Sequence, residues 1–358
     1  MNLLGQRIAG LIAAQGPISV AQFMTLALHD PDYGVYAARN AIGRAGDFIT
    51  APEISQMFGE LLGAWCVAVW HQLGKPQPLR LIELGPGRGT LMADALRAAK
   101  TDREFAAHTE VVLVEASAPL KAAQQQALAQ SPFPLRWENH LSGGLLDQPF
   151  LLLANEFFDA LPLRQYVWKD ERWHERMVTL VDDALTFAAA PAPAAGLSVP
   201  SARGAPEPGA VYEISPSAIA LCEEIAHAVQ RQGGAALIAD YGYAQSGFGD
   251  TLQALSSHTP VPVLHDPGSA DLSAHVDFTA LSDATTPAGA NPFGPVAQGD
   301  FLKALGIEAR AAALIRANPA AADAVARALH RLTDDTAMGR LFKMFAITPL
   351  ASAPPPGF

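Results

Sequence analysis

From Leu79 onward, short apolar runs alternate with segments of helical spacing, and this alternation constrains the fold of the 358-residue chain more than any other feature. Strands and helices that alternate in this way predict an α/β fold with a parallel, doubly wound, Rossmann-like sheet. Ligands of such sheets bind at the carboxyl ends of the strands, where the strand order reverses. The predicted strands are 79–84, 111–114, 135–137, 150–154 and 235–239, and the first predicted helices between them are 91–99 and 119–129.

The segments around this core predict additions to the sheet. Residues 1–78 are expected to form an N-terminal helical region, with helices at 3–15, 20–28 and 53–73 and a polar loop between the last two. Residues 79–350 are expected to form the core, with insertions at about 163–210 and 290–335. Period-2 runs within 163–185 predict a β-hairpin, the Ala/Pro-rich stretch 188–209 predicts a loop, 298–332 predict helices, and 351–358 predict a flexible tail.

Composition excludes several classes of protein. No apolar run approaches the roughly 20 residues that cross a bilayer, and the first residues match neither a signal nor a transit peptide, so we expect a cytoplasmic protein that does not insert into membranes. The net charge of −11 argues against a nucleic-acid partner, which would require a basic face. The two cysteines, Cys66 and Cys222, predict neither a disulfide framework nor a metal site.

A glycine-rich loop, Glu83-Leu84-Gly85-Pro86-Gly87-Arg88-Gly89, joins the first predicted strand to its helix. Gly85, Gly87 and Gly89 permit a tight turn and a close approach of the backbone to a ligand. The dinucleotide pattern G-x-G-x-x-G fails because Thr90 takes its sixth position, and the lysine of a P-loop is missing. The spacing E-x-G-x-G-x-G is that of methyltransferases, in which the acidic residue, here Glu83, lies near the amine of the cofactor.

A second acidic residue supports this interpretation. Glu115 ends the next predicted strand, where a carboxylate accepts hydrogen bonds from both hydroxyls of a ribose. Trp137 ends the third predicted strand, where it would stack on adenine or, as an alternative, belong to the core. Thr50 would contact the ligand from a loop, 47–53, that folds over the cofactor, or only cap the following helix. The expected residues of an S-adenosylmethionine site are Thr50, Glu83, Gly85, Gly87, Gly89, Glu115, Trp137 and Asn155.

Longer blocks of the sequence resemble the MidA family. They are Asp30–Tyr36, Gly46–Ser55, Glu83–Gly89, Asn155–Pro162, Asp240–Tyr243 and Ala274–Phe278, and they extend over most of the chain. The resemblance implies a class I methyltransferase that uses S-adenosylmethionine. Because mitochondrial members of the family are protein arginine methyltransferases and assembly factors of respiratory complex I, it also implies symmetric dimethylation of an arginine on a complex I subunit. The sequence does not decide whether the protein forms a homodimer. The resemblance implies a mitochondrial location only for the eukaryotic relatives.

An arginine acceptor places a requirement on the site. The guanidinium is a cation that does not readily lose its proton, and a pair of carboxylates holds its plane through bidentate hydrogen bonds. Glu156 and Asp159 follow the fourth predicted strand at the edge where substrate and cofactor meet. We predict that Glu156 is the principal anchor of the guanidinium and that Asp159 is the second. The alternative is that Glu156 contacts the cofactor or caps a helix.

His275 is the third residue expected to take part in catalysis. It lies between Asp271 and Asp277 and would accept the proton that is released on transfer, since its ordinary pKa is near 6.5. The alternative is a helix start with Asp271 as its N-cap and a hydrogen-bonded His275. A metal site is disfavoured because no second histidine lies at ligand spacing.

Two other functions remain compatible with the sequence. A methyltransferase of small molecules would have the same fold, which by itself does not separate the two. A non-catalytic assembly factor would bind S-adenosylmethionine only to become ordered, with the predicted hairpin and the Ala/Pro-rich loop as surfaces for its partner.

Overall fold

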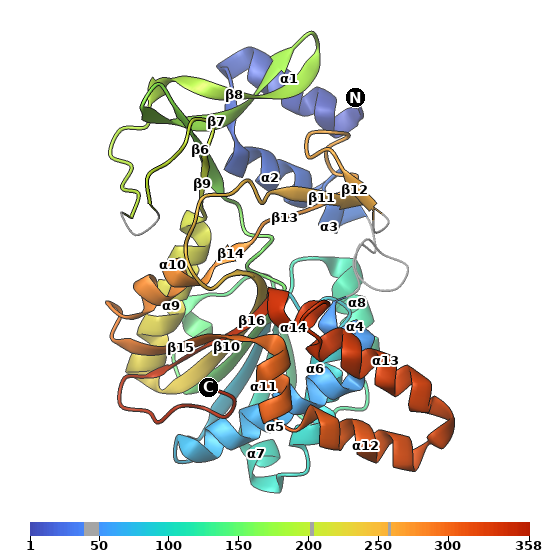
Figure 1. Ribbon diagram of the computed structural model, residues 1–358. Coiled ribbons are helices and arrows are strands. Elements are labelled where there is room, and N and C mark those ends of the chain that lie inside the picture. Colours follow the sequence, from blue (N-terminus) through green and yellow to red (C-terminus); the bar gives the residue numbers. More distant parts are fainter. Residues whose placement is uncertain (39–49, 201–203, 257–258) are drawn as a thin grey trace.

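The computed structural model describes residues 1–38, 50–200, 204–256 and 259–358. A twisted sheet lies at its centre, with the strand order β15-β16-β10-β5-β2-β3-β4 (Figure 1). Five of these strands are parallel to one another, whereas β16 runs antiparallel to both of its neighbours. The strands are β2 (Leu79–Leu84), β3 (Thr109–Val114), β4 (Leu135–Glu138), β5 (Phe150–Asn155), β10 (Gly234–Tyr243), β15 (Ala290–Ala297) and β16 (Phe342–Pro349).

The strand order reverses between β2 and β5. The chain builds outward from β2 through β3 to β4, and then returns to the other side of β2 to add β5 and β10. This is a doubly wound α/β sheet, as the alternation of elements predicted. Since ligands bind at such a reversal, the residues that follow β2 and β5 are those to inspect for a site.

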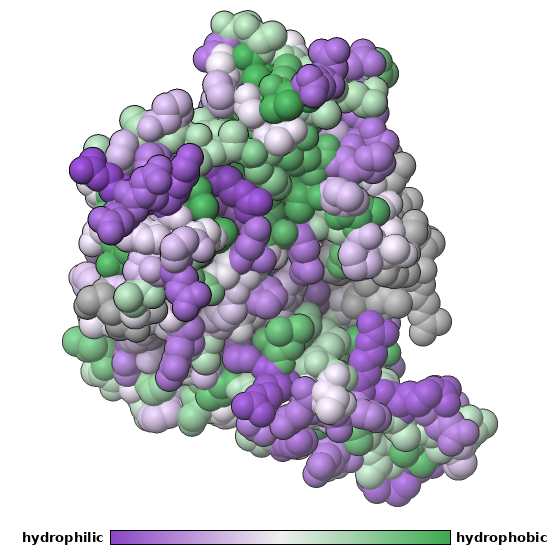
Figure 2. All heavy atoms as spheres, turned by 45° about the horizontal axis from the view of Figure 1, so that its top comes forward, coloured by the Kyte–Doolittle hydropathy of each residue, from purple (hydrophilic) through white to green (hydrophobic). Residues whose placement is uncertain are grey.

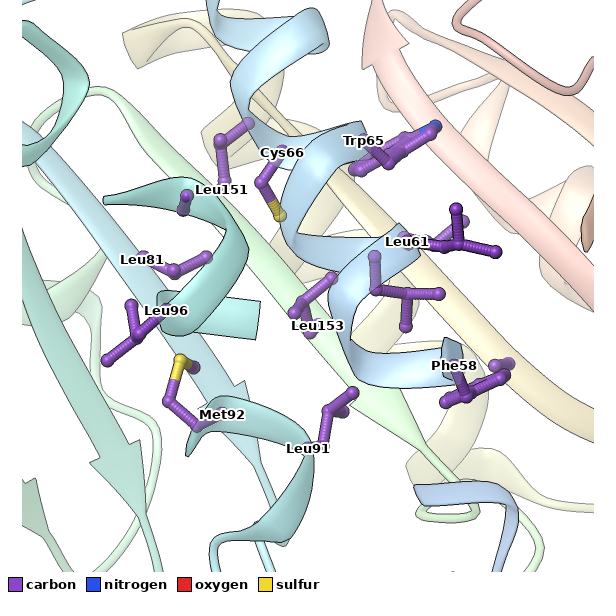
Figure 3. Close-up of a cluster of buried hydrophobic side chains, with 14 of the residues drawn as sticks. Phe58, Leu61, Trp65, Cys66, Leu81, Leu91, Met92, Leu96, Leu151 and Leu153 are labelled. Carbon is purple, nitrogen blue, oxygen red and sulfur yellow. The ribbon is translucent and has the colours of Figure 1, made fainter. Parts of the chain in front are cut away.

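Helices cover both faces of the sheet. On one face lie α5 (Gln56–Gln72) and α6 (Thr90–Ala99), whose buried side chains meet those of β2 and β5 (Figure 3). Helix α5 forms here because its apolar residues recur at helical spacing, which directs Leu61 and Trp65 to the core. The other face is covered by α9 (Pro216–Gln232) and α10 (Phe278–Thr285). The shorter helices α7 (Arg103–His108) and α8 (Ala118–Ala127) follow α6 and β3.

A second, antiparallel sheet lies above the carboxyl edge of the central sheet (Figure 1). The predicted hairpin is confirmed as β6 (Arg164–Lys169) and β7 (Arg172–Val181). The prediction of a loop for 188–209 is wrong in its first part, because β8 (Ala184–Pro193) pairs with β7. Strand β8 lies at an edge of the sheet, where prolines are tolerated. The remaining strands around this sheet are β1 (Ile18–Ser19), β9 (Val211–Ile214), and a small sheet of β11 (Gln253–Ser256), β12 (Thr259–Val261) and β13 (Asp271–Ser273).

The expected N-terminal region divides between the two sheets. Helices α1 (Leu3–Gln15) and α2 (Val20–His29) pack with residues of the antiparallel sheets, and α3 (Val35–Ala38) follows them. The single helix predicted for 53–73 is instead two, α4 (Ala51–Ile54) and α5. Ser55 separates them, since its backbone is extended and its hydroxyl accepts a hydrogen bond from Met57 N–H at the start of α5.

The C-terminal region begins and ends with a strand of the central sheet, β15 and β16. Strand β15 opens the predicted insertion but belongs to the sheet, and the helices that follow are α11 (Gln298–Ala304), α12 (Ile307–Ala317), α13 (Ala322–Thr333) and α14 (Met338–Leu341). The prediction of a flexible tail is wrong: Phe358 packs on Phe301, and Trp65 Nε1 donates to the carbonyl oxygen of Pro356. None of the helices in the described ranges is long and apolar enough to cross a membrane.

The contact of α5 with α6 yields a prediction about stability. A methyl group at Gly63 would lie 2.2 Å from the carbonyl oxygen of Ala95, so Gly63→Ala forces the two helices apart. We expect it to lower the free energy of unfolding in urea by about 1–3 kcal/mol. Gly10→Ala is the matched control, because Gly10 lies within α1 and nothing would touch its methyl group; it should raise stability by up to about 1 kcal/mol. Equal effects of the two substitutions would contradict the close packing of α5 on α6.

Candidate functional site

The glycine loop between β2 and α6 adopts a backbone that favours glycine. Gly85, Gly87 and Gly89 have φ values of 60°, 53° and 82°, in the left-handed region. A Cβ atom at Gly85 would lie 2.7 Å from the ring of Phe157, in the loop that follows β5. The loop is therefore a tight turn at the end of β2 that packs against the loop after β5.

Glu83, at the end of β2, carries a buried oxygen that lacks a partner. Its side chain is 2% exposed, and Oε2 has no hydrogen bond to any residue that the structure describes. Burial, followed by the nearby charge of Glu115, raises the pKa of Glu83 to about 8. A buried carboxyl oxygen without a donor is costly, so this arrangement suits a ligand that brings a cationic N–H group.

Glu115 lies beyond the end of β3, within a network that leads back to the glycine loop. Its Oε1 accepts from Ser117 N–H at 2.8 Å, and its Oε2 accepts from Gln124 Nε2 at 3.3 Å. The same Gln124 Nε2 donates to the carbonyl oxygen of Gly87 at 2.7 Å, and Trp137 Nε1 donates to Gln124 Oε1 at 3.0 Å. Trp137 is half-buried against the core and orients Gln124; stacking on adenine stays a prediction. No local pattern points to Gln124, which lies in a run of three glutamines.

The short helix α4 connects the glycine loop to β5. Thr90 Oγ1, at the start of α6, donates to Glu53 Oε1 at 2.5 Å, and Ala51 N–H donates to Glu156 Oε1 at 3.0 Å. Thr50 takes the N-cap position of α4, but its side chain makes no capping hydrogen bond. Whether 47–53 cover the ligand stays a prediction, since 47–49 lie outside the described residues.

Glu156 follows β5 in a constrained position. Its φ of 49° is unusual for a residue with a side chain, and its N–H donates to the carbonyl oxygen of Ala239 at 2.8 Å. Asn155 Nδ2 donates to Glu156 Oε1, whereas Asn155 Oδ1 has no partner in the described part of the chain. Burial raises the pKa of Glu156 to about 7. Its carboxyl group accepts from the N–H of Ala51, the first residue of α4, so Glu156 satisfies a free donor at the N-terminus of that helix, as the alternative predicted.

Asp159 lies three residues further along, and a third carboxyl group fixes its backbone. Asp240 is fully buried in β10 and accepts hydrogen bonds from the N–H groups of Phe158, Asp159 and Tyr241. Burial and then the charge of Glu156 raise the pKa of Asp159. That Glu156 and Asp159 hold one ligand as a pair stays a prediction. Asp240 was not among the predicted site residues, although it opens one of the family-like blocks.

His275 follows β13 and lies at the same cavity as Asp159. Its ring contacts those of Tyr241 and Tyr243, and its Nδ1 has no hydrogen bond within the described ranges. Burial, with a smaller effect of Lys343, lowers the pKa of His275. The ring lines a cavity of about 420 Å³ together with Asp159. A role in proton transfer remains a prediction.

The alternative for this segment, Asp271 as a helix cap, is wrong. Asp271 lies in β13 and accepts a hydrogen bond from Tyr36 Oη at 3.1 Å. The N-cap of α10 is Asp277, which accepts from Ala280 N–H. No group of three or more His, Cys, Asp or Glu side chains in the described residues is arranged to hold a metal ion.

Similarity to known proteins agrees with this geometry. Residues 61–296, well over half of the chain, match the Methyltransf_28 family, which is described as S-adenosyl-L-methionine-dependent methyltransferase. The matched region contains the glycine loop, Glu115, Glu156 and His275.

Named relatives cover almost the whole chain. A protein of Drosophila melanogaster named "Protein arginine methyltransferase NDUFAF7 homolog, mitochondrial" is 37% identical over 384 residues, which cover 97% of this chain and 85% of the relative. The Homo sapiens protein named "Protein arginine methyltransferase NDUFAF7, mitochondrial" is 34% identical over 367 residues, covering 94% and 81%.

A solved structure is also similar. It is a crystal structure of a protein from Burkholderia thailandensis bound to S-adenosyl-homocysteine, with a TM-score of 0.85 and 26% identity, covering 99% of this chain and 94% of the other. The residues found here fit such a ligand. The unpaired oxygen of Glu83 could accept from the amine of the ligand, the glycine loop allows the ligand to approach the backbone closely, and Glu115 could accept from the ribose hydroxyls.

The buried carboxyl group of Glu83 leads to a prediction in two parts. Because burial raises its pKa from the unfolded value near 4.5 to about 8, the free protein loses stability as pH rises between these values, by at most about 1.4 kcal/mol per pH unit. Glu83→Gln removes this loss, so its stability advantage over the wild type should grow from pH 5 to pH 8 in urea titrations.

The same variant should bind S-adenosylhomocysteine more weakly, because the amine loses its anionic partner. Calorimetry with 5′-methylthioadenosine, which lacks the amino-acid part of the ligand, is the control and should give equal affinities for wild type and variant. An unchanged affinity of the variant for S-adenosylhomocysteine would contradict the assignment of Glu83 to the amine.

Proposed function

This chain belongs to the Methyltransf_28 family of S-adenosyl-L-methionine-dependent methyltransferases, and we propose that its acceptor is an arginine side chain of a protein. The finer part of this proposal, the arginine, is supported by the names of relatives that are 34–37% identical. It is supported independently by the chemistry of the residues that follow β5.

The observation that carries the proposal is the pair Glu156 and Asp159. Asp159 is buried and Glu156 is half-buried, each carboxyl group has a raised pKa, and the charge of Glu156 contributes to the rise at Asp159. Two such groups repel one another when both are ionised, unless a cation lies between them. A guanidinium is the cation that matches two carboxylates in shape, through parallel N–H···O hydrogen bonds. A neutral acceptor would leave the pair without a counter-charge.

The two carboxylates also have a catalytic task. S-adenosylmethionine supplies an electrophilic methyl group when it is bound. Glu156, held by Ala51 and Asn155, would fix the plane of the guanidinium and orient one nitrogen toward the cofactor. Asp159, whose pKa is raised, is suited to accept the proton that leaves that nitrogen. His275 would be the next acceptor, since its lowered pKa keeps it neutral at pH 7.

The proposed substrate is a subunit of respiratory complex I, with symmetric dimethylation of one arginine. The resemblance to the MidA family supports this substrate. The Glu156–Asp159 pair supports the arginine but does not select among proteins that carry one.

The experiment that tests this function is transfer of an isotope-labelled methyl group. The purified protein is incubated with methyl-labelled S-adenosylmethionine and with complex I subunits isolated from cells that lack this protein. We expect label in one subunit, and fragment masses from tandem mass spectrometry that place two methyl groups, one on each terminal nitrogen, on a single arginine. Label on another residue type or only in small molecules would reject the proposal.

The carboxylate pair predicts a separation of binding from turnover. Glu156→Gln should lower the rate of methyl transfer on the order of 100-fold, because the guanidinium is no longer oriented, while affinity for S-adenosylhomocysteine stays within a small factor. Asp159→Asn should act in the same sense. Glu308→Gln, on α12, is the control and should have the wild-type rate. Wild-type turnover by Glu156→Gln would remove the proposed anchor.

A further inference from the structure

The helices α12 and α13 form an arm that extends from the central sheet, and its second helix returns to the site. Figure 2 shows the arm as a projecting lobe with many hydrophilic side chains. One face of α13 is apolar and packs, with Leu332 fully buried, on the core that includes Ile54 of α4. Gln298 Nε2 donates to the carbonyl oxygen of Leu332 at 2.9 Å and fixes this end of α13. The last turn of α13 therefore lies on α4, which itself contacts Glu156 and Thr90 (Figure 1).

Arg331 lies in that last turn. Its side chain is exposed, and it forms no ion pair or hydrogen bond with any residue in the described ranges. Arg97 and Arg310, by contrast, both pair with Glu60, and Arg97 pairs with Asp94 as well. Although burial dominates the pKa of Glu156 and raises it, the positive charge of Arg331 acts on Glu156 in the opposite direction. Arg331 is thus a cation without a partner among the described residues, on a helix that contacts α4 and, through Ala51, adjoins Glu156.

The cofactor of this family brings an anion to the same region. Its methionine part carries an amine and a carboxylate on one carbon atom, and the amine is assigned to Glu83. The carboxylate would then lie among Glu83, Glu156 and Asp159, which repel it once they are ionised. The N-terminus of α6 would ordinarily receive such an anion. At that N-terminus, however, the carboxylate of Glu53 already accepts a hydrogen bond from Thr90 Oγ1.

We propose that Arg331 binds the α-carboxylate of the methionine part of S-adenosylmethionine. A guanidinium and a carboxylate pair through two parallel hydrogen bonds. The arm of α12 and α13 then becomes part of the cofactor site, although it lies far along the chain from the glycine loop. The inference rests on the cofactor of the family and not on the arginine acceptor, so a different acceptor would leave it intact.

The test compares two ligands that differ only in the carboxylate. S-adenosylhomocysteine and its decarboxylated analogue, 5′-deoxy-5′-(3-aminopropylthio)adenosine, share adenine, ribose, sulfur and amine. The wild-type protein should bind S-adenosylhomocysteine roughly tenfold or more tightly than the analogue in titration calorimetry, as expected for a charged hydrogen-bonded pair. In Arg331→Ala the ratio of the two affinities should fall to about one, while the affinity for the analogue stays unchanged.

Two further variants separate this role from a structural one. Arg327→Ala, one turn earlier on α13, should keep the wild-type preference, and Arg331→Lys should restore part of it because the charge remains without the bidentate geometry. Thermal unfolding of each variant checks that α13 stays folded. The proposal is overturned if the wild type does not distinguish the two ligands, if Arg331→Ala keeps the preference, or if it weakens both ligands equally.

Discussion

The parallel pairing of β2 with β5 brings together two loops that lie about 70 residues apart in the chain, and the site depends on it. Leu84 lies opposite Ala154 in this pairing, so the glycine loop and the segment from Asn155 to Asp159 leave the sheet at the same level. The ring of Phe157 then fills the space that a Cβ atom at Gly85 would need. Helix α4 connects the two loops through its hydrogen bonds. A change of register in β5 would separate the glycine loop from the proposed acceptor pair.

Buried carboxyl groups are the second constraint. Glu83, Asp159 and Asp240 are buried at one edge of the sheet and Glu156 is half-buried there, and burial raises the pKa of each. Only Asp240 is satisfied by three backbone N–H groups, which marks it as the structural member of the group. Glu83 differs from it, because its Oε2 has no donor among the described residues, and a cationic group of the ligand would complete it. We therefore propose that the site binds two cations, the amine of the cofactor and the guanidinium of the substrate.

The sequence predicted the parts of this arrangement that local patterns encode. Period-3.6 and period-2 apolar spacing located α1, α5, α6 and the strands β2 to β5, and the motif spacing located the glycine loop. Pairings that join distant segments were missed: β16 inserts antiparallel beside β10, and the apparent tail closes on Trp65 through Pro356. Gln124 and Asp240 were missed because their roles arise from three-dimensional contacts. Asp277 rather than Asp271 caps α10, since the intervening residues form β13 and β14 (Val276–Asp277).

We infer that the buried carboxyl group of Glu83, at the end of β2, is neutral in the free protein and becomes the anionic partner of the cofactor. The most direct test is the number of protons released when S-adenosylhomocysteine binds at pH 7, measured by calorimetry in buffers of different ionisation enthalpy. With a pKa of about 8 in the free protein, Glu83 starts largely protonated and ionises against the amine, so the account predicts release of about one proton per ligand bound. Tight binding without proton release would contradict it.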